Sequence, residues 1–206
     1  MNETSGAVIW WILGPLFIAV LIYLAWFQLK RKKMLEAFAR AHQMDVRPDL
    51  RDSIQKTLDD CFKLGEGGFI RTFGQLSSIV DGGSIRLLRA IELLDLNPRG
   101  QSSSTHFARI AALFEIGTRH DSFFVLSKSK EVRPRLGGST AVDSAVAQAA
   151  RRIAAACNAR HALSVTLAQG HGLIYFEPVV TGGENRSDVE SLYCIAEKMQ
   201  EEFGDG

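Results

Sequence analysis

A basic, glycine-containing loop at residues 128–140 holds the side chains best suited to bind an anion. Four cations precede two hydroxyl groups in it: Lys128, Lys130, Arg133, Arg135, Ser139 and Thr140. A helix is predicted to begin at this end of the loop, where free N–H groups and the helix dipole favour negative charge. The loop therefore predicts a site for a phosphate, a nucleotide or a lipid headgroup. The alternative is a solvated loop whose cations only balance nearby acids.

The histidines show no metal-binding or catalytic spacing. The chain contains five of them: His42, His106, His120, His161 and His171. No pair is spaced as H-x-x-x-H, and the sequence has no G-x-S-x-G motif for a serine nucleophile. We expect His120 and His171 to lie in surface turns and His106 to be a hydrogen-bonded residue at the flank of a strand. The sequence predicts no catalytic residue, no metal and no cofactor.

The location of the whole chain is predicted by an uncharged apolar run at residues 7–27, AVIWWILGPLFIAVLIYLAWF. About 21 residues with a rise of about 1.5 Å each cover roughly 31 Å, the thickness of a hydrocarbon core. The run predicts a single transmembrane helix, with residues 1–6 as an extracytoplasmic tail. A cleaved signal peptide is the alternative, but the basic start and the A-x-A cleavage pattern of such a peptide are absent.

Charge predicts the orientation of this span. Residues 1–6 contain no Lys or Arg. Four cations follow the run: Lys30, Arg31, Lys32 and Lys33. The positive-inside bias places the N-terminus outside and the rest of the chain in the cytoplasm, at the inner membrane of a bacterium. We expect the four cations to lie at the membrane surface, where anionic lipid attracts them.

The predicted orientation also predicts the chemical state of the cysteines. Cys61, Cys157 and Cys194 are odd in number and widely spaced, and the predicted compartment is reducing. We therefore expect small buried apolar residues rather than disulfide partners or metal ligands.

The part of the chain from residue 34 onward is close to neutral, with 20 basic and 22 acidic residues. A nucleic-acid-binding protein normally presents a basic face, so we expect no nucleic-acid partner. The size suits one domain with a core of its own. We expect a basic juxtamembrane segment and helical stalk at residues 28–64 and a cytoplasmic domain at residues 65–206.

Helical patterns occur in four places. A short apolar stripe at Leu35, Phe38 and Ala39 extends the membrane helix, and a second helix begins at Pro48 and ends at Gly65. A third helix starts after a cap at Ser139 or Thr140. A fourth starts at a capping box that runs from Ser187 to Glu190.

Strand patterns alternate with turn signals through the rest of the chain. We predict strands near the end of 69–80 and at 85–96, 105–116, 122–127, 163–167 and 173–177. The composition of 85–96 also fits a helix, but the Asp-Gly-Gly turn before it favours a strand. In 105–116 Arg109 and Glu115 point away from the apolar face, which predicts a half-buried strand. The fold class is α+β, a mainly antiparallel sheet covered by helices in the order α-α-β-β-β-β-α-β-β-α.

Two segments and the general layout carry a resemblance. FARAH at residues 38–42 follows the span and its basic boundary, and LSVTLAQGHGLIYFEP at residues 163–178 forms a hairpin pattern before a closing helix. This layout resembles a loose group of bacterial single-span membrane proteins with a cytoplasmic α+β domain. The resemblance implies the fold and the location, and no activity.

Two functions remain open from the sequence. The first is a tethered interaction or scaffold module, whose partners are membrane lipids through one helix and a second membrane or membrane-proximal protein. The second is a sensor or enzyme that binds an anion, nucleotide or lipid headgroup through loop 128–140.

Overall fold

The computed structural model describes residues 4–62, 64–66, 69–96, 103–117, 122–129, 131–134, 142–177 and 185–204, with some side chains inside these ranges left out. The chain forms two units, Met1–Met34 and Leu35–Gly206, and each is considered by itself. Within the described residues, no helix is both long enough and apolar enough to cross a membrane.

Helix α1, Thr4–Ala41, contributes to both units. Its large apolar side chains between Leu13 and Leu29 that the structure describes are exposed. In the second unit one face of its last turns is buried, with Leu35, Phe38 and Ala39 at most 1% exposed. The predicted apolar stripe is therefore confirmed, and it lies on the same helix as the apolar run.

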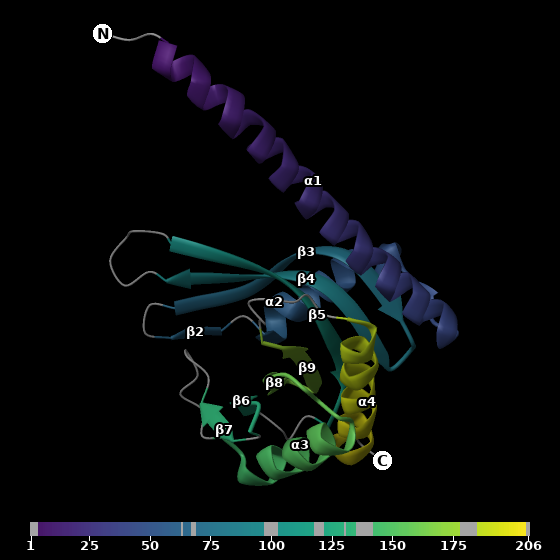
Figure 1. Ribbon diagram of the computed structural model, residues 1–206. Helices are drawn as coiled ribbons and strands as arrows, with labels where there is room; N and C mark the ends of the chain where they lie inside the picture. The colour runs from purple at the N-terminus through teal and green to yellow at the C-terminus, as the bar shows by residue number, and fades with distance from the viewer. Residues whose placement is uncertain are drawn as a thin grey trace. The chain divides into compact units, whose positions relative to one another are not determined.

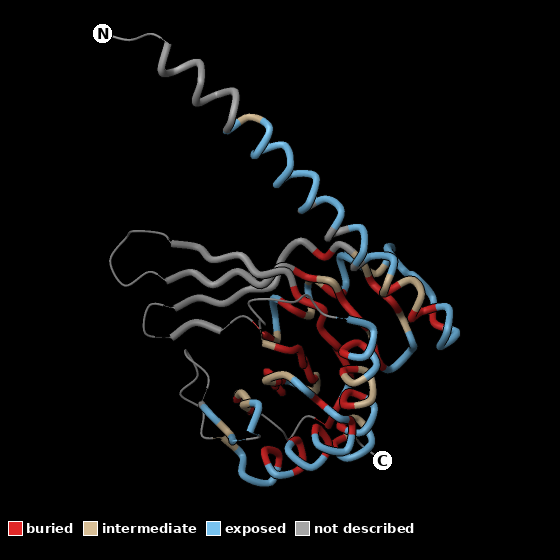
Figure 2. Tube along the Cα trace, in the orientation of Figure 1, coloured by how far each residue is buried: buried red, intermediate tan, exposed pale blue. Residues whose placement is uncertain are grey.

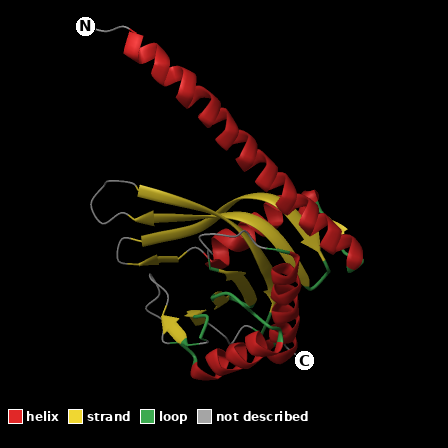
Figure 3. Ribbon diagram, viewed as in Figure 1, coloured by secondary structure: helices red, strands yellow, loops and turns green. Residues whose placement is uncertain are grey.

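The second unit has an α+β arrangement, in which runs of strands are separated by a few helices (Figures 1 and 3). After α1 the elements are β1 (Asp45–Val46), the 3-10 turn η1 (Pro48–Leu50), α2 (Arg51–Phe62), β2 (Leu64–Glu66), β3 (Phe69–Asp81), β4 (Ile85–Leu96), β5 (Ser103–Glu115), β6 (Ser122–Leu126), β7 (Val132–Pro134), α3 (Ser144–Ala156), β8 (Leu163–Ala168), β9 (His171–Phe176) and α4 (Arg186–Phe203). The sequence missed β1, β2 and β7, which are two or three residues long. Gly65 lies in β2 and does not end the second helix as predicted.

The strands form one antiparallel sheet in the order β1-β3-β4-β5-β9-β8-β6-β7, with β2 also on β3. Residues 85–96 form a strand, as predicted. The turn before them explains why pairing overrides their helical composition: the Gly82 N–H donates to the Ile85 carbonyl, and Gly83 has φ of 85°. A hairpin follows from this turn, and β4 then pairs along its whole length with β5.

The predicted hairpin at β8 and β9 is confirmed, with a tighter turn than the sequence indicated. Only Gln169 and Gly170 form the turn, with φ of 50° and 81°, because His171 already pairs with Ala168. Gly172 lies directly against the ring of Phe114 on β5, which leaves no room for a Cβ atom. The glycine therefore allows β9 to approach β5 closely.

Helices cover both faces of the sheet. Helix α2 and one sheet face form a cluster that includes Leu58, Leu113 and Tyr175. Helix α4 packs against the other face through apolar side chains that are at most 1% exposed: Val189, Leu192, Ile195, Ala196 and Met199. The buried side of α4 is visible in Figure 2.

Coverage on both faces corrects the half-buried prediction for β5. Arg109 is 5% exposed and its guanidinium lies 5.6 Å from the ring centroid of Tyr175, although the sequence pattern placed it in solvent. Glu115 is exposed, as predicted. Alternation of polar and apolar residues does not identify the outer face here, because a helix covers each face.

The N-cap of α4 lies two residues before the predicted cap, Ser187. Asn185 is the N-cap, and its side chain accepts from the Asp188 N–H while the Asp188 carboxylate accepts from the Asn185 N–H. The Ser187 hydroxyl donates to the Asn185 side chain and caps nothing. The capping box is therefore Asn185 with Asp188, so the predicted box from Ser187 to Glu190 is wrong.

Packing of α4 on the sheet predicts a large difference between two adjacent residues. Met199→Ala leaves a cavity under a fully buried side chain and lowers the free energy of unfolding by about 2–5 kcal/mol. Lys198→Ala is the matched control at an exposed position and changes it by less than about 0.5 kcal/mol. Urea unfolding followed by circular dichroism measures both, and equal values for the two variants would contradict this packing.

Candidate functional site

The predicted anion loop is described only in part. Lys128 and Arg133 are exposed, and Arg133 lies 3.6 Å from the carboxylate of Glu131. The other four predicted ligands lie outside the described residues: Lys130, Arg135, Ser139 and Thr140. The anion site therefore stays a prediction, supported by one cation paired with an acid and one other exposed cation.

The helix end that gave this prediction its physical basis is already capped by an acid. Helix α3 begins at Ser144, and its N-cap is Asp143 rather than Ser139 or Thr140. The Asp143 carboxylate accepts from the N–H groups of Ala145 and Val146 at 2.8 and 3.4 Å. A fixed negative charge thus occupies the position that a bound anion would take.

The predicted membrane-surface cations lie on α1, directly after the apolar run. The Lys30 Nζ lies 5.4 Å from the ring centroid of Trp26, within range of a cation–π interaction. Lys32 and Lys33 are exposed, and the side chain of Arg31 lies outside the described residues. Their contact with lipid stays a prediction.

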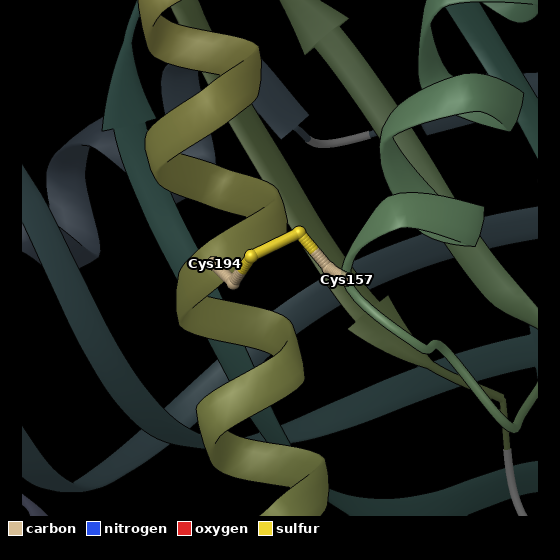
Figure 4. Close-up of a disulfide and its surroundings, with 2 residues drawn as sticks. All are labelled: Cys157 and Cys194. Carbon is tan, nitrogen blue, oxygen red and sulfur yellow. A yellow bond between two sulfur atoms is a disulfide. The ribbon is translucent and has the colours of Figure 1, made fainter.

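Two of the three cysteines form a disulfide, which corrects the sequence interpretation. Cys157 and Cys194 are joined with their Cα atoms 5.9 Å apart, although 37 residues separate them in the sequence (Figure 4). Cys157 is the C-cap of α3, and Cys194 lies in the middle of α4. Spacing along the chain did not indicate this pair because only the packing of α3 beside α4 brings them together.

An open groove lies beside this disulfide, between the end of α3 and the first half of α4. Its volume is about 690 Å³, and the lining residues are Ala155, Ala156, Cys157, Asn158, Ala159, Arg160, Ser187, Glu190, Ser191 and Cys194. Cys157 is 6% exposed, and Cys194 is partly exposed. Arg160 and Glu190 add one charge of each sign, and both are exposed. In the part of the chain that the structure describes, this groove places the disulfide at the solvent-accessible surface.

A contact between the partly buried His161 and the buried Asp188 supports the same end of α4. The Nε2 of His161 lies 3.3 Å from the carboxylate of Asp188, whose side chain is 5% exposed. The His161 ring also meets Phe176 edge-on, with centroids 5.7 Å apart. His161 precedes β8 and Asp188 belongs to the α4 capping box, so this contact ties the start of α4 to the sheet.

The remaining cysteine, Cys61, lies beside His171 without the features of an activated nucleophile. Its Sγ is 3.8 Å from the Nδ1 of His171 and 3.9 Å from the Oε1 of Gln169. Burial raises the pKa of the Cys61 thiol, and the charge of Asp60 raises it further. Reactive cysteines usually have a lowered pKa, so the raised pKa does not indicate a nucleophile, and the Cys61–His171 contact joins α2 to the hairpin. His171 is partly buried in this contact, although the sequence placed it in a surface turn.

No cluster of three or more possible metal ligands occurs among the residues that the structure describes. Comparison with known proteins adds no assignment: no family model, no curated protein and no solved structure matches the chain.

The raised pKa predicts slow alkylation of Cys61. At pH 8 its thiolate fraction is below that of an unstructured cysteine, so iodoacetamide reacts more slowly with the folded protein than with a peptide of residues 55–66. Asp60→Asn removes a charge that raises the pKa and speeds the reaction, whereas Asp52→Asn serves as a control that leaves the rate unchanged. Mass spectrometry follows both rates, and a thiol faster than the peptide would show that Cys61 is activated.

Proposed function

We propose that the protein is a single-span, membrane-anchored interaction module, with the Leu35–Gly206 unit on the cytoplasmic side of a bacterial inner membrane. The observation that supports this best is the apolar surface of α1. Its exposed large apolar side chains are Leu13, Leu16, Phe17, Ile18, Val20, Leu21, Ile22, Tyr23, Trp26 and Leu29.

The distribution of these side chains favours lipid over a protein groove as their cover. Residues 16–18 and 20–22 are consecutive, and successive residues of a helix lie about 100° apart, so apolar groups point in every direction. An amphipathic helix in the membrane interface needs a polar face, which this segment lacks. Hydrocarbon surrounds such a helix on all sides, and the uncharged run at residues 7–27 has the length of its core.

The same helix ends inside the folded domain. Phe38 stacks on His42 with centroids 4.1 Å apart, and Tyr193 of α4 lies 5.5 Å from each ring. Helix α1, Thr4–Ala41, thus includes both the apolar run and the residues that pack in the second unit. The cations that follow the apolar run support the cytoplasmic orientation.

The interaction role is supported by what the domain offers a second protein. It is close to neutral, so it neither repels other proteins nor attracts nucleic acid, and confinement to a membrane raises its effective concentration for membrane partners. An anion-binding sensor or enzyme at loop 128–140 is less well supported, because the Asp143 carboxylate caps the helix end that would bind the anion.

Membrane anchoring predicts sensitivity to charge in α1 alone. Ile18→Arg with Leu21→Arg adds about 2.5–3.5 kcal/mol per residue to the insertion free energy and moves the protein from the carbonate-washed membrane pellet to the supernatant. The matched control is Val46→Arg with Gln148→Arg, at two exposed positions of the domain, and it stays in the pellet. A wild-type protein in the supernatant would refute the anchor.

A second experiment addresses the interaction role. Photo-cross-linking residues at the exposed positions Asp52, Gln148 and Glu201 of the full chain are expected to give a discrete adduct with another membrane protein in native membranes. An absence of adducts at every position would contradict the module and leave the anchor intact.

A further inference from the structure

We propose that the groove between α3 and α4 is a site of thiol–disulfide exchange, at which a dithiol protein of the thioredoxin class opens the Cys157–Cys194 bond and releases the end of α3. This inference rests on the proposed cytoplasmic orientation. Cysteine thiols in the cytosol are kept reduced, and the disulfides that do form there are usually transient, catalytic or redox-sensing. A disulfide in a domain on that side of the membrane is therefore expected to change state.

The groove gives a reductant access to the bond. Both cysteines line it, and the partly exposed Cys194 is the more accessible of the two. The other lining residues are alanines, serines and an asparagine with one Arg and one Glu, so most side chains around the two cysteines are small. A volume of about 690 Å³ admits the reactive end of another protein as well as a small thiol.

The two helices differ in how much they depend on the bond. Four of the six buried residues of α3 are alanines, which bury little apolar area: Ala147, Ala149, Ala150 and Ala154. Helix α4 instead buries Val189, Leu192, Ile195, Met199 and Phe203. Apolar area buried sets the strength of packing, so α4 stays on the sheet without the bond and α3 is the helix that loosens.

The only other described polar tie between the helices is weak. Arg152 of α3 and Glu202 of α4 are 2.6 Å apart, but their side chains are 71% and 40% exposed. Exposed ion pairs contribute little to stability, and salt screens them. The disulfide is thus the strongest described link between the end of α3 and α4, beside the packing of small apolar side chains.

The exchange balances without any further reactant. A thiolate of the dithiol attacks the Cys194 sulfur, the bond to Cys157 breaks, and Cys157 leaves as a thiolate. The second thiolate of the dithiol protein then attacks the first sulfur of the same protein, which is bonded to Cys194 in the mixed disulfide. Cys194 leaves as a thiolate. The dithiol is oxidised by two electrons, and its two protons end on Cys157 and Cys194. A protein disulfide of the same class reverses the reaction.

Hydrogen exchange on the full chain in lipid nanodiscs tests the release. All samples contain Cys61→Ser, so that the thiols counted by alkylation come from the pair alone. Reduction by dithiothreitol or by a thioredoxin-class protein is expected to expose two thiols and to speed exchange in Ser144–Ala156 at least about tenfold. The β8–β9 hairpin is the internal control and stays protected.

A variant with Cys157→Ser and Cys194→Ser is expected to exchange fast in α3 with or without reductant. Unchanged exchange in α3 after reduction would overturn the proposal. Equal loss of protection in the hairpin would also overturn it, because the bond would then support the whole fold and not one helix.

Rapid acid quenching and alkylation of cells tests whether the bond changes state. We expect part of the protein to be reduced in growing cells and to become oxidised within minutes of adding the thiol oxidant diamide. A bond that is oxidised, or reduced, under every condition would overturn the proposal. Membrane pelleting of the same samples reports separately on the anchor: a pelleted protein with an unresponsive cystine overturns the exchange site alone, and a soluble protein overturns the proposed anchoring.

Discussion

The structure depends on burying both faces of the β4–β5 pair at the centre of the sheet. Leu88 and Leu113 face α2, while Ile110 lies beside Val189 and Leu192 of α4. An antiparallel sheet often leaves one face to solvent, but here each face has its own helix. Because α2 covers one face and α4 the other, the Leu35–Gly206 unit has apolar core on both sides of the sheet. This packing also fixes α4, the helix on which the disulfide, the His161–Asp188 pair and the contact with the end of α1 all depend.

Local patterns in the sequence predicted most of the regular structure. The turn at Asp81–Gly83 indicated a hairpin, and that hairpin resolved the ambiguous 85–96 segment in favour of a strand. The α+β class, the β8–β9 hairpin and the apolar faces of α2 and α4 followed from periods of two and of three to four residues. Helix starts were less accurate, because Asn185 and Asp143 cap α4 and α3 in place of nearby hydroxyl residues. Ser, Thr, Asp and Asn all suit an N-cap, and the sequence alone does not show which of several neighbouring residues of these types forms it.

Features that depend on distant contacts escaped sequence analysis. Cys157 and Cys194 meet only because α3 packs beside α4, and the burial of Arg109 needs a helix on the face that the strand pattern leaves polar. The candidate anion loop shows the converse, since a chemically attractive run of cations ends at a helix whose N–H groups already bind Asp143. Residue types indicated possible chemistry, and tertiary packing determined which groups meet.

The most direct test of the account measures depth along α1 in nanodiscs. Nitroxide labels on single cysteines at residues 18 and 40, in a background with Cys61→Ser, Cys157→Ser and Cys194→Ser, report contact with oxygen dissolved in lipid and with an aqueous nickel chelate. A membrane anchor predicts that the label at residue 18 meets oxygen and is shielded from nickel, while the label at the exposed position 40 shows the reverse. Equal and high nickel contact at both positions would contradict the account.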